Sequence, residues 1–339
     1  DCQIRNVWTG IAGAHIRSFN SSGMVAIKDK EVTAADVSRV IETARAVNIP
    51  TDQQLLHTVR QEFIVDSQEG VREPIGMNGI RLEVRVHIVT GAVSAVQNIL
   101  KCVRRCGLEV VDLILQPMAS ADAVLTLDEK ELGVVLVDIG GGTTDVAIFT
   151  EGAIRHTAVI PIAGDQITND IAMALRTPTA EAEEIKVRYG VAKQVLADPG
   201  ESFDVPGLGD RAARALSRQA LAAVIEPRVE ELFSLVHQVV RESGFEEVLS
   251  SGIVLTGGSA MMPGMMELAE DIFLKPARVG IPDYNGQLAD VVKSPRYSTV
   301  LGLLLEAKQQ YLRGQVVHRQ ASSAGAVLQR MKEWFLGNF

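Results

Sequence analysis

The sequence predicts an α/β protein with more than one domain, and three observations support this prediction. Stretches with the residue pattern of strands alternate with stretches that have the pattern of helices. A chain of 339 residues with 47% hydrophobic content can bury a large core and exceeds the usual size of one domain. Two buried-strand patterns, at 134–139 and 253–256, run directly into glycine-rich turns.

The first third of the chain predicts two strands with a helix between them. Residues 7–13 (VWTGIAG) have the pattern of a strand that enters a turn. Residues 31–47 place apolar side chains at helical spacing, with Thr33 as the expected N-cap and Asp36 in the first turn. Residues 80–90 (IRLEVRVHIVT) alternate strictly, which predicts a half-exposed strand. Because the chain opens in a strand pattern and without methionine, we expect that a portion of the natural protein precedes it.

The middle of the chain predicts a helix followed by several strands. Residues 92–107 show helical spacing and end in Gly107, a residue suited to a helix C-terminus. Residues 108–117, 133–149 and 152–164 have β character, and the second of these stretches has the pattern of strand, turn and strand.

The last part of the chain becomes mainly helical. Helical patterns cover 165–175, 179–190 and 211–244, and the last of these is the longest. Residues 252–273 predict a strand, a glycine-rich turn and a helix, and residues 297–312 predict one further helix.

Charge and cysteine content exclude some classes of function. The formal net charge is −9, which argues against a nucleic-acid-binding surface, so we expect no nucleic acid as a partner. The three cysteines include no C-x-x-C pair, which is typical of reduced thiols. Cys102 and Cys106 lie one helical turn apart and are interpreted as helix packing residues. No apolar run approaches the length of a membrane span.

The stretch VVLVDIGGGTTDVAIF at 134–149 predicts a β-hairpin with a glycine tip that binds phosphate. Gly140, Gly141 and Gly142 would expose backbone N–H groups with no side chain in the way. A Walker loop needs a lysine and a following helix, whereas the residues after this turn have a strand pattern. The alternative is a tight hairpin without a ligand, although a bare turn needs fewer glycines.

Polar residues on both sides of the three glycines complete this phosphate site. Thr143 and Thr144 could add hydroxyl donors, and Asp145 begins the returning strand. Asp138, at the end of the incoming strand, could hold Mg²⁺ through water, since Mg²⁺ favours one or two carboxylates together with substrate phosphates.

Two further motifs are weaker when each is taken alone. At 253–264, a strand pattern ends in Gly257, Gly258 and Ser259, which would let the backbone approach a flat ligand such as adenine; a purely structural corner is the alternative. Glu183 and Lys186 lie three residues apart on one helical face and could bracket ribose hydroxyls; a solvated ion pair is the alternative.

The order of these three motifs, phosphate hairpin, E-x-x-K helix and T-G-G-S corner, resembles that of the actin-like ATPase superfamily. Within it, the chain is similar to the FtsA family of bacterial cell division proteins. The resemblance implies an actin-like (ribonuclease H-like) two-lobed ATPase fold with an FtsA-type inserted small subdomain, and ATP with Mg²⁺ bound between the lobes. The family's first phosphate hairpin, D-x-G-T/S, precedes the point that matches the first residue here. The segments that carry the resemblance are ELGVVLVDIGGGTTDVAIFTEGAIRHTAVIPIAG, IKVRYG, AAVIEPRVEEL, GIVLTGGSAMMPGM and YSTVLGLL.

The resemblance also implies a division of the chain into segments. The expected segments are 1–11, a remnant of the first lobe; 12–88, the inserted small subdomain; 89–131, first lobe; 132–165, second lobe; 166–247, the helical subdomain of the second lobe; 248–312, second lobe and return to the first; 313–325, a linker; and 326–339, an amphipathic helix.

Two of these segments imply protein partners. The inserted subdomain of the family takes part in self-association into filaments and recruits later division proteins. The helical subdomain binds the C-terminal peptide of FtsZ, which is acidic and apolar. Candidate contacts for that peptide are Arg211, Arg214, Arg218 and Arg228. The alternative is that these arginines form a solvated helix face.

The last residues predict a membrane contact independently of the resemblance. A short stretch with Trp and Phe on one side after a polar linker is typical of an in-plane membrane anchor; a helix docked on the body is the alternative. The apolar stripe consists of Val327, Leu328, Met331, Trp334, Phe335 and Phe339. Together with this tail, the resemblance implies a location at the cytoplasmic face of the bacterial inner membrane, at the division site.

Three functions fit these features. The first is an ATP-binding, membrane-tethering polymer subunit of cell division. The second is another actin-fold ATPase, a sugar kinase or a DnaK-type chaperone, although the chain shows neither a sugar site nor a large β-rich domain after the ATPase. The third is a PilM-type pilus-assembly scaffold. No residue can be named as a catalytic base from the sequence. The sequence therefore does not decide whether the chain hydrolyses ATP weakly.

Overall fold

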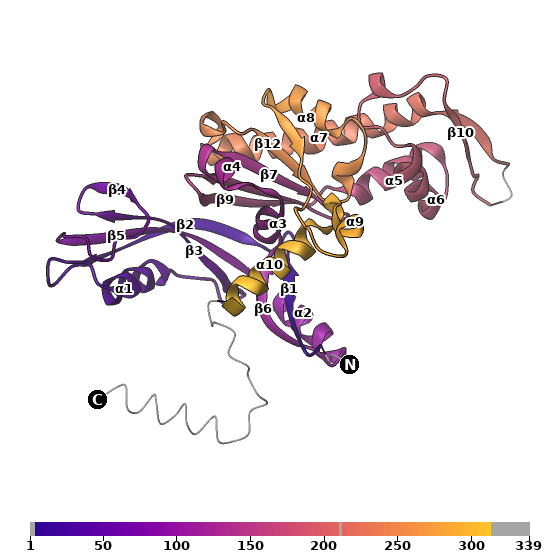
Figure 1. Cartoon of the computed structure of the whole chain (residues 1–339). Coiled ribbons are helices and arrows are strands. Elements are labelled where there is room, and N and C mark those ends of the chain that lie inside the picture. Colours follow the sequence, from indigo (N-terminus) through magenta and orange to yellow (C-terminus); the bar gives the residue numbers. More distant parts are fainter. Residues whose placement is uncertain (1–3, 210–211, 313–339) are drawn as a thin grey trace.

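The structure, a computed structural model, describes residues 4–209 and 212–312 of the chain. Figure 1 shows an elongated molecule in which a central sheet separates a small β-rich subdomain at one end from helices and a hairpin at the other. The predicted linker and amphipathic helix at 313–339 lie outside the described residues.

The central sheet has five strands in the order β13-β12-β7-β8-β9. β7 and β8 form the predicted glycine hairpin, and β8 is antiparallel to β9, whereas β12 runs parallel to both β7 and β13. The bounds are β7 Val134–Ile139, β8 Thr144–Thr150, β9 Ala153–Ile160, β12 Ile253–Thr256 and β13 Ala277–Val279. β7, β8 and β12 are buried along their whole length, and in β7 and β12 this burial matches nearly continuous runs of Val, Ile and Leu.

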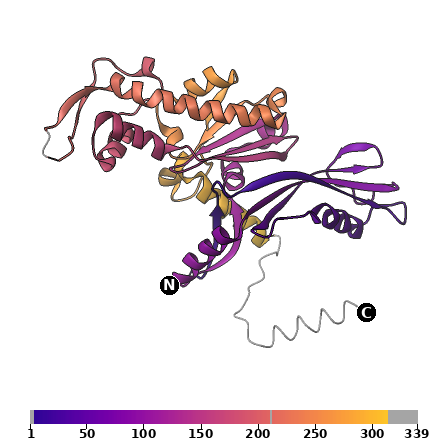
Figure 2. The same ribbon diagram turned by 180° about the vertical axis from the view of Figure 1, so that it is seen from behind.

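Helices cover both faces of this sheet. One face packs against α5, α6, α7 and α8, and Figure 2 shows the long α7 running across it. The other face packs against α3, and Leu301 of α10 joins that cluster. The bounds are α3 Gln116–Val124, α4 Leu127–Leu132, α5 Gly164–Leu175, α6 Thr179–Tyr189, α7 Arg218–Ser243, α8 Met265–Phe273, α9 Ala289–Val292 and α10 Ser298–Leu312. α3 and α10 touch so closely that a Cβ on Gly302 would lie 1.8 Å from the carbonyl oxygen of Ala119.

The subdomain at the other end is a four-stranded antiparallel sheet in the order β2-β5-β3-β4. Its helix α1 begins with the predicted cap, in which Thr33 and Asp36 form a reciprocal capping box. The bounds are β2 Arg17–Ala26, α1 Ala34–Arg45, β3 Gln53–Val65, β4 Gln68–Val71 and β5 Arg81–Ala92. Beside it, β1 Asn6–Ile11 pairs in parallel with β6 Glu109–Leu115, and α2 Val93–Arg105 connects β5 to β6.

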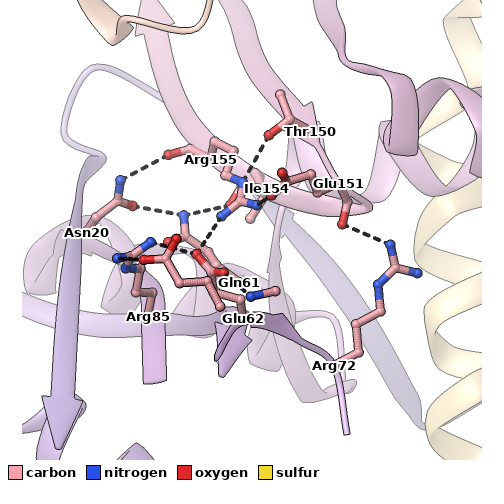
Figure 3. Close-up of polar contacts among 11 residues, drawn as sticks. Asn20, Gln61, Glu62, Arg72, Arg85, Thr150, Glu151, Ile154 and Arg155 are labelled. Carbon is pink, nitrogen blue, oxygen red and sulfur yellow. Dashed lines mark hydrogen bonds and ion pairs between the residues drawn. The ribbon is translucent and has the colours of Figure 1, made fainter. Parts of the chain in front are cut away.

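Side chains of the subdomain sheet bond to strand β9 of the central sheet. Ser18 Oγ donates to the carbonyl oxygen of Thr157 at 2.9 Å, and Gln61 Nε2 donates to that of Ile154 at 2.9 Å. The amide of Asn20 donates to the carbonyl oxygen of Arg155 at 3.3 Å (Figure 3). The subdomain is therefore attached to the same sheet that carries the glycine hairpin.

Charged residues line a cavity of about 750 Å³ beside this contact. Arg155 is buried, and its guanidinium donates to Thr150 Oγ1 at 3.0 Å and pairs with Glu151. Glu62 of the subdomain lies 3.8 Å from Arg155 and accepts from Arg85 at 2.9 Å (Figure 3). Both guanidinium groups that line this cavity are thus already paired with carboxylates.

Three of the sequence-based predictions about local structure are wrong. The helix predicted from 211 begins only at Arg218, because residues 214–217 form strand β11 (Arg214–Ser217), which pairs with β10 (Ser202–Val205). The second half of β5 is buried on both faces rather than half exposed, because β9 covers the face opposite α1. Cys102 and Cys106 are exposed and do not serve as packing residues.

His87, a buried histidine of the subdomain sheet, allows a test of the attachment of this sheet to strand β9. His87 Nδ1 lies 2.8 Å from Asn20 Oδ1, and its Nε2 lies 3.0 Å from Thr157 Oγ1 on β9. Burial lowers the pKa of His87 to about 4, so the ring is neutral at pH 7. Asn20 Oδ1 can only accept, so Nδ1 carries the proton and Nε2 accepts from Thr157.

We expect Thr157→Val to lower the free energy of unfolding by about 1–3 kcal/mol, because His87 Nε2 would lose its donor inside the protein. Urea unfolding at pH 7 measures this. The matched control is Thr58→Val on β3, because Thr58 Oγ1 is buried without a hydrogen-bond partner among the described residues. Equal losses in the two variants would contradict the prediction.

Candidate functional site

The glycine hairpin places its two aspartates directly opposite each other. Asp138 of β7 pairs with Asp145 of β8, and their exposed fractions are 8% and 4%. Burial, together with the negative charge of Asp138, raises the pKa of Asp145 to about 7. Burial also raises the pKa of Asp138. Two carboxyl groups this close and this buried favour sharing their site with a proton or a cation.

Asp138 is held from two helices. Ser120 Oγ of α3 donates to Asp138 Oδ2 at 2.5 Å, and Thr299 Oγ1 of α10 lies 3.3 Å from the same oxygen. Asp145 is different, because its Oδ1 is buried and has no hydrogen-bond partner among the described residues. A buried, unpaired carboxylate oxygen is what a site for a cation requires.

The tip of the hairpin leaves backbone donors free. Gly140 N donates to the carbonyl oxygen of Thr143 at 3.0 Å and closes the turn. The N–H groups of Gly141 and Gly142 donate to no acceptor within 4–209 and 212–312, and both glycines are exposed. Such free N–H groups at a glycine tip are suited to a phosphate.

The two threonines after the tip have different roles. Thr143 Oγ1 lies 3.3 Å from Asp145 Oδ2 and is partly exposed at the tip. Thr144 is fully buried, and its hydroxyl donates to the carbonyl oxygen of Ile162 at 2.7 Å. Both hydroxyl protons are thus used within the protein, but Thr143 makes the longer bond, to Asp145 Oδ2, and is partly exposed, so it is the better donor for a ligand.

The corner after β12 packs against the base of the hairpin. Gly257 has a φ of +87°, and a Cβ there would lie 2.4 Å from the carbonyl oxygen of Ile139 and 2.6 Å from Asp138 Oδ1. Only glycine fits both this backbone conformation and this space. Ser259 Oγ donates to the carbonyl oxygen of Gly140 at 3.1 Å. Gly258 has open space around it, because a Cβ added there would have no described atom within 4 Å.

The E-x-x-K pair, Glu183 and Lys186, is connected to the carbonyl oxygen of Gly140 through the start of α5. Lys186 Nζ donates to the carbonyl oxygen of Gly164 at 3.0 Å and to Thr168 Oγ1 at 2.8 Å, and it pairs with Glu183 at 2.6 Å. Gly164 N donates in turn to the carbonyl oxygen of Gly140 at 3.1 Å. Lys186 is buried, whereas about half of the Glu183 side chain is exposed. Glu183 is thus the member of the pair that can contact a ligand.

The structure therefore brings together all three motifs that the sequence analysis singled out. The backbone around Gly140 is the meeting point, with free N–H groups on one side and the two aspartates on the other. The described residues contain no group of three or more His, Cys, Asp or Glu arranged to hold a metal ion by themselves. The unpaired oxygen of Asp145 and the pair of carboxylates nevertheless fit Mg²⁺ bound together with phosphate oxygens.

The arginines proposed for a peptide lie elsewhere, on the helical part of the molecule. Arg214 of β11 donates to the carbonyl oxygen of Leu175, Arg218 at the start of α7 pairs with Glu201, and Arg228 further along α7 pairs with Asp170. Arg211 and the six residues of the apolar stripe lie outside the described residues.

Ser120 and Thr299 were not predicted from the sequence as site residues. Both are small hydroxyl residues within helices, where no motif marks them. Thr299 is the second residue of α10 and Ser120 lies in the middle of α3, and neither position separates them from other serines and threonines.

No helix in the described part of the chain combines the length and the apolar character that a membrane-spanning helix needs.

Comparisons with known proteins identify the family. The family model described as "Cell division protein FtsA" matches residues 135–302, and the one described as "SHS2 domain inserted in FTSA" matches residues 13–90. The chain is 60% identical to the cell division protein FtsA of Pseudomonas aeruginosa, over 100% of this chain and 82% of that protein. It is 53% identical to FtsA of Neisseria meningitidis, over 100% and 83%. For FtsA of Escherichia coli K12 the identity is 43%, over 100% and 83%.

Solved structures confirm the predicted fold. A PilM–PilN type IV pilus biogenesis complex matches 89% of this chain and 79% of that chain with a TM-score of 0.62 at 18% identity. MreB5 of Spiroplasma citri bound to AMPPNP matches 66% and 68% with a TM-score of 0.55 at 19% identity. The actin-like fold with an FtsA-type inserted subdomain is therefore correct. From the family models and the identities over its full length, the chain belongs to the FtsA family of cell division proteins.

Proposed function

We propose that this chain binds ATP with Mg²⁺ at the β7–β8 hairpin and acts as a membrane-tethered filament subunit that links FtsZ to the membrane. The observation that carries the nucleotide part is the convergence of the hairpin tip, the start of α5 and the β12 corner on Gly140. The cell division part rests on membership of the FtsA family.

The site offers a distinct group for each part of the nucleotide. The free N–H groups of Gly141 and Gly142 would bind phosphate oxygens, with Thr143 as a further donor. Asp138 and Asp145 would face Mg²⁺, which supplies positive charge that neutralises the phosphates. The open space at Gly258 would admit the adenine, and Glu183 would reach the ribose. The solved MreB5 structures contain AMPPNP or ADP and share this fold.

Other parts of the chain would bind the partner proteins. Residues 166–247 would bind the FtsZ C-terminal peptide, whose acidic groups would compete with Glu201 and Asp170 for Arg218 and Arg228. Residues 12–88 would mediate self-association into filaments and contacts with later division proteins. We propose these binding roles for this chain because it belongs to the FtsA family. The fold likeness to the PilM–PilN complex, at 18% identity, favours no second function.

Residues 326–339 would anchor the protein to the cytoplasmic face of the inner membrane after the linker at 313–325. The apolar stripe contains Trp334 and Phe335, and only one acidic residue lies in this stretch. A single short amphipathic segment binds membranes weakly, so filament formation would strengthen the binding through multivalency.

The anchor is tested by vesicle co-sedimentation of the whole chain and of a chain that ends at Gln320, with and without FtsZ. We expect the shorter chain to lose vesicle binding and to leave FtsZ in the supernatant, while it still binds FtsZ in solution. Trp334→Glu should have the same effect, because it places a charge in the apolar stripe. Gln329→Glu adds the same charge off the stripe and serves as the matched control. Unchanged vesicle binding by the shorter chain would contradict the proposal.

The acid–base state of Asp145 makes nucleotide binding depend on pH. Because burial raises its pKa to about 7, Asp145 carries a proton below pH 7, and binding of Mg²⁺ to this carboxylate would require the loss of that proton. We expect the affinity for ATP with Mg²⁺ to fall as pH drops through 7, approaching roughly tenfold per pH unit. Fluorescent ATP titrations between pH 5.5 and 8.5 measure this. In EDTA the affinity should not fall, and the same fall there would show that Asp145 does not face the metal.

The same carboxyl group should destabilise the protein when no ligand is bound. Burial raises its pKa from 3.8 to about 7, so the stability it contributes is present below pH 3.8 and is lost as pH rises to 7. We expect Asp145→Asn to be more stable than wild type by roughly 1–4 kcal/mol at pH 8, and equally stable near pH 4. Urea unfolding at the two pH values measures this.

The matched control for this stability measurement is Asp165→Asn. Asp165 is an exposed carboxylate whose backbone N–H bonds to the same hairpin, at the carbonyl oxygen of Gly141. Because Asp165 is exposed, its replacement relieves no cost of burying a charge, so we expect no gain in stability at pH 8. An Asp145→Asn protein that is less stable than wild type at pH 8 would be inconsistent with a buried, destabilising carboxyl group.

A further inference from the structure

Asp138 has one oxygen that is held and one that is free. Oδ2 faces the hydroxyl groups of Ser120 and Thr299 at 2.5 and 3.3 Å. Oδ1 makes no hydrogen bond with any described residue, and it lies on the side of Gly257, where a Cβ would come within 2.6 Å. The carboxylate is therefore oriented, with Oδ1 available to a ligand.

The count of hydroxyl protons shows which of Ser120 and Thr299 is the main donor to Asp138. Ser120 Oγ and Thr299 Oγ1 lie 2.9 Å apart, so the two hydroxyls and Asp138 Oδ2 form a triangle. Each hydroxyl has one proton to donate. Ser120 uses its proton on the carboxylate at the shortest of the three distances, and Thr299 donates either to Ser120 or to Asp138. Ser120, which is fully buried, is thus the main donor, and Thr299 orients it.

The two hydroxyl groups come from helices whose spacing is set by close contact. Gly302 of α10 packs on the carbonyl oxygen of Ala119, the residue before Ser120, with no room for a Cβ. In the first turn of α10, the residue before Thr299 makes a second contact: Ser298 Oγ lies 2.6 Å from Thr256 Oγ1, at the end of strand β12. α10 therefore touches both the strand that leads to the corner and the carboxylate of the hairpin.

We propose that Ser120 and Thr299 are positioning residues that orient the carboxylate of Asp138 toward Mg²⁺ at the nucleotide site. This inference rests on the proposed nucleotide binding. Neither hydroxyl contacts the metal or the nucleotide in this role, because both bond to the oxygen of Asp138 that faces the helices. Their contribution is to hold one rotation of the carboxylate, so that Mg²⁺ need not order it on binding.

The test compares the Mg²⁺ requirement of nucleotide binding in several variants of the whole chain. Ser120→Ala removes the main donor, Thr299→Val removes the second hydroxyl at nearly constant shape, and Thr299→Ser keeps it. The matched control is Thr177→Val, because Thr177 Oγ1 is buried without a partner among the described residues. Fluorescent ATP is titrated at increasing Mg²⁺ and in EDTA, and thermal unfolding is recorded without nucleotide.

We expect Ser120→Ala to raise the Mg²⁺ concentration for half-maximal binding roughly tenfold, and Thr299→Val to raise it by a smaller factor. Affinity in EDTA should not change, and Thr299→Ser and Thr177→Val should behave as wild type. If Ser120→Ala does not fold, the comparison of Thr299→Val with Thr299→Ser carries the test, since Thr299 is only partly buried.

Three outcomes would contradict these expectations. Folded variants with a wild-type Mg²⁺ requirement overturn the positioning role and leave the proposed nucleotide binding standing. An equal loss of affinity in Mg²⁺ and in EDTA also overturns it, because it shows a general structural effect. A wild-type protein whose nucleotide binding does not depend on Mg²⁺ overturns the proposed metal site, and the positioning role with it.

Discussion

The candidate site depends on one backbone atom, the carbonyl oxygen of Gly140. It accepts hydrogen bonds from Gly164 N and from Ser259 Oγ, which lies 119 residues further along the chain. A Cβ on Gly164 would lie 2.6 Å from Ser259 Oγ, so the three segments can meet only where side chains are absent. Lys186 joins them through the carbonyl oxygen of Gly164. The three segments thus meet at main-chain oxygens, to which the side chains of Ser259 and Lys186 donate.

Strand β9 has two roles that connect the ends of the molecule. It is the neighbour of β8, in register with Asp145 through Val159, and it is also the strand to which the inserted subdomain bonds. Most of those bonds run from side chains of the subdomain to main-chain oxygens of β9, so they depend on the position of the strand more than on its sequence. The hairpin and the subdomain are therefore connected through the same strand.

Local sequence patterns predicted turns and capped helices, which depend on neighbouring residues. Elements that depend on contacts between distant residues could not be predicted in this way. The glycine hairpin could be predicted from local spacing, whereas strands β2 and β3 of the subdomain and helices α3 and α4 were not predicted from the sequence. The helix predicted over 211–244 fails at its start, because residues 214–217 pair with 202–205, and such a pairing overrides helical propensity. Ser120 and Thr299 are 179 residues apart, so no pattern could show that they meet at Asp138.

The contact of Gly302 with Ala119 has a mechanical consequence. Two helices whose backbones already touch cannot move closer, and they cannot separate without breaking the hydroxyl contact between Ser120 and Thr299 beside them. The relative motion that keeps both contacts is a rotation about the point where the helices touch. Gly302 thus marks the point about which such a rotation would occur, and Asp138, which is bonded to Ser120 and Thr299 beside that point, would be displaced little by it.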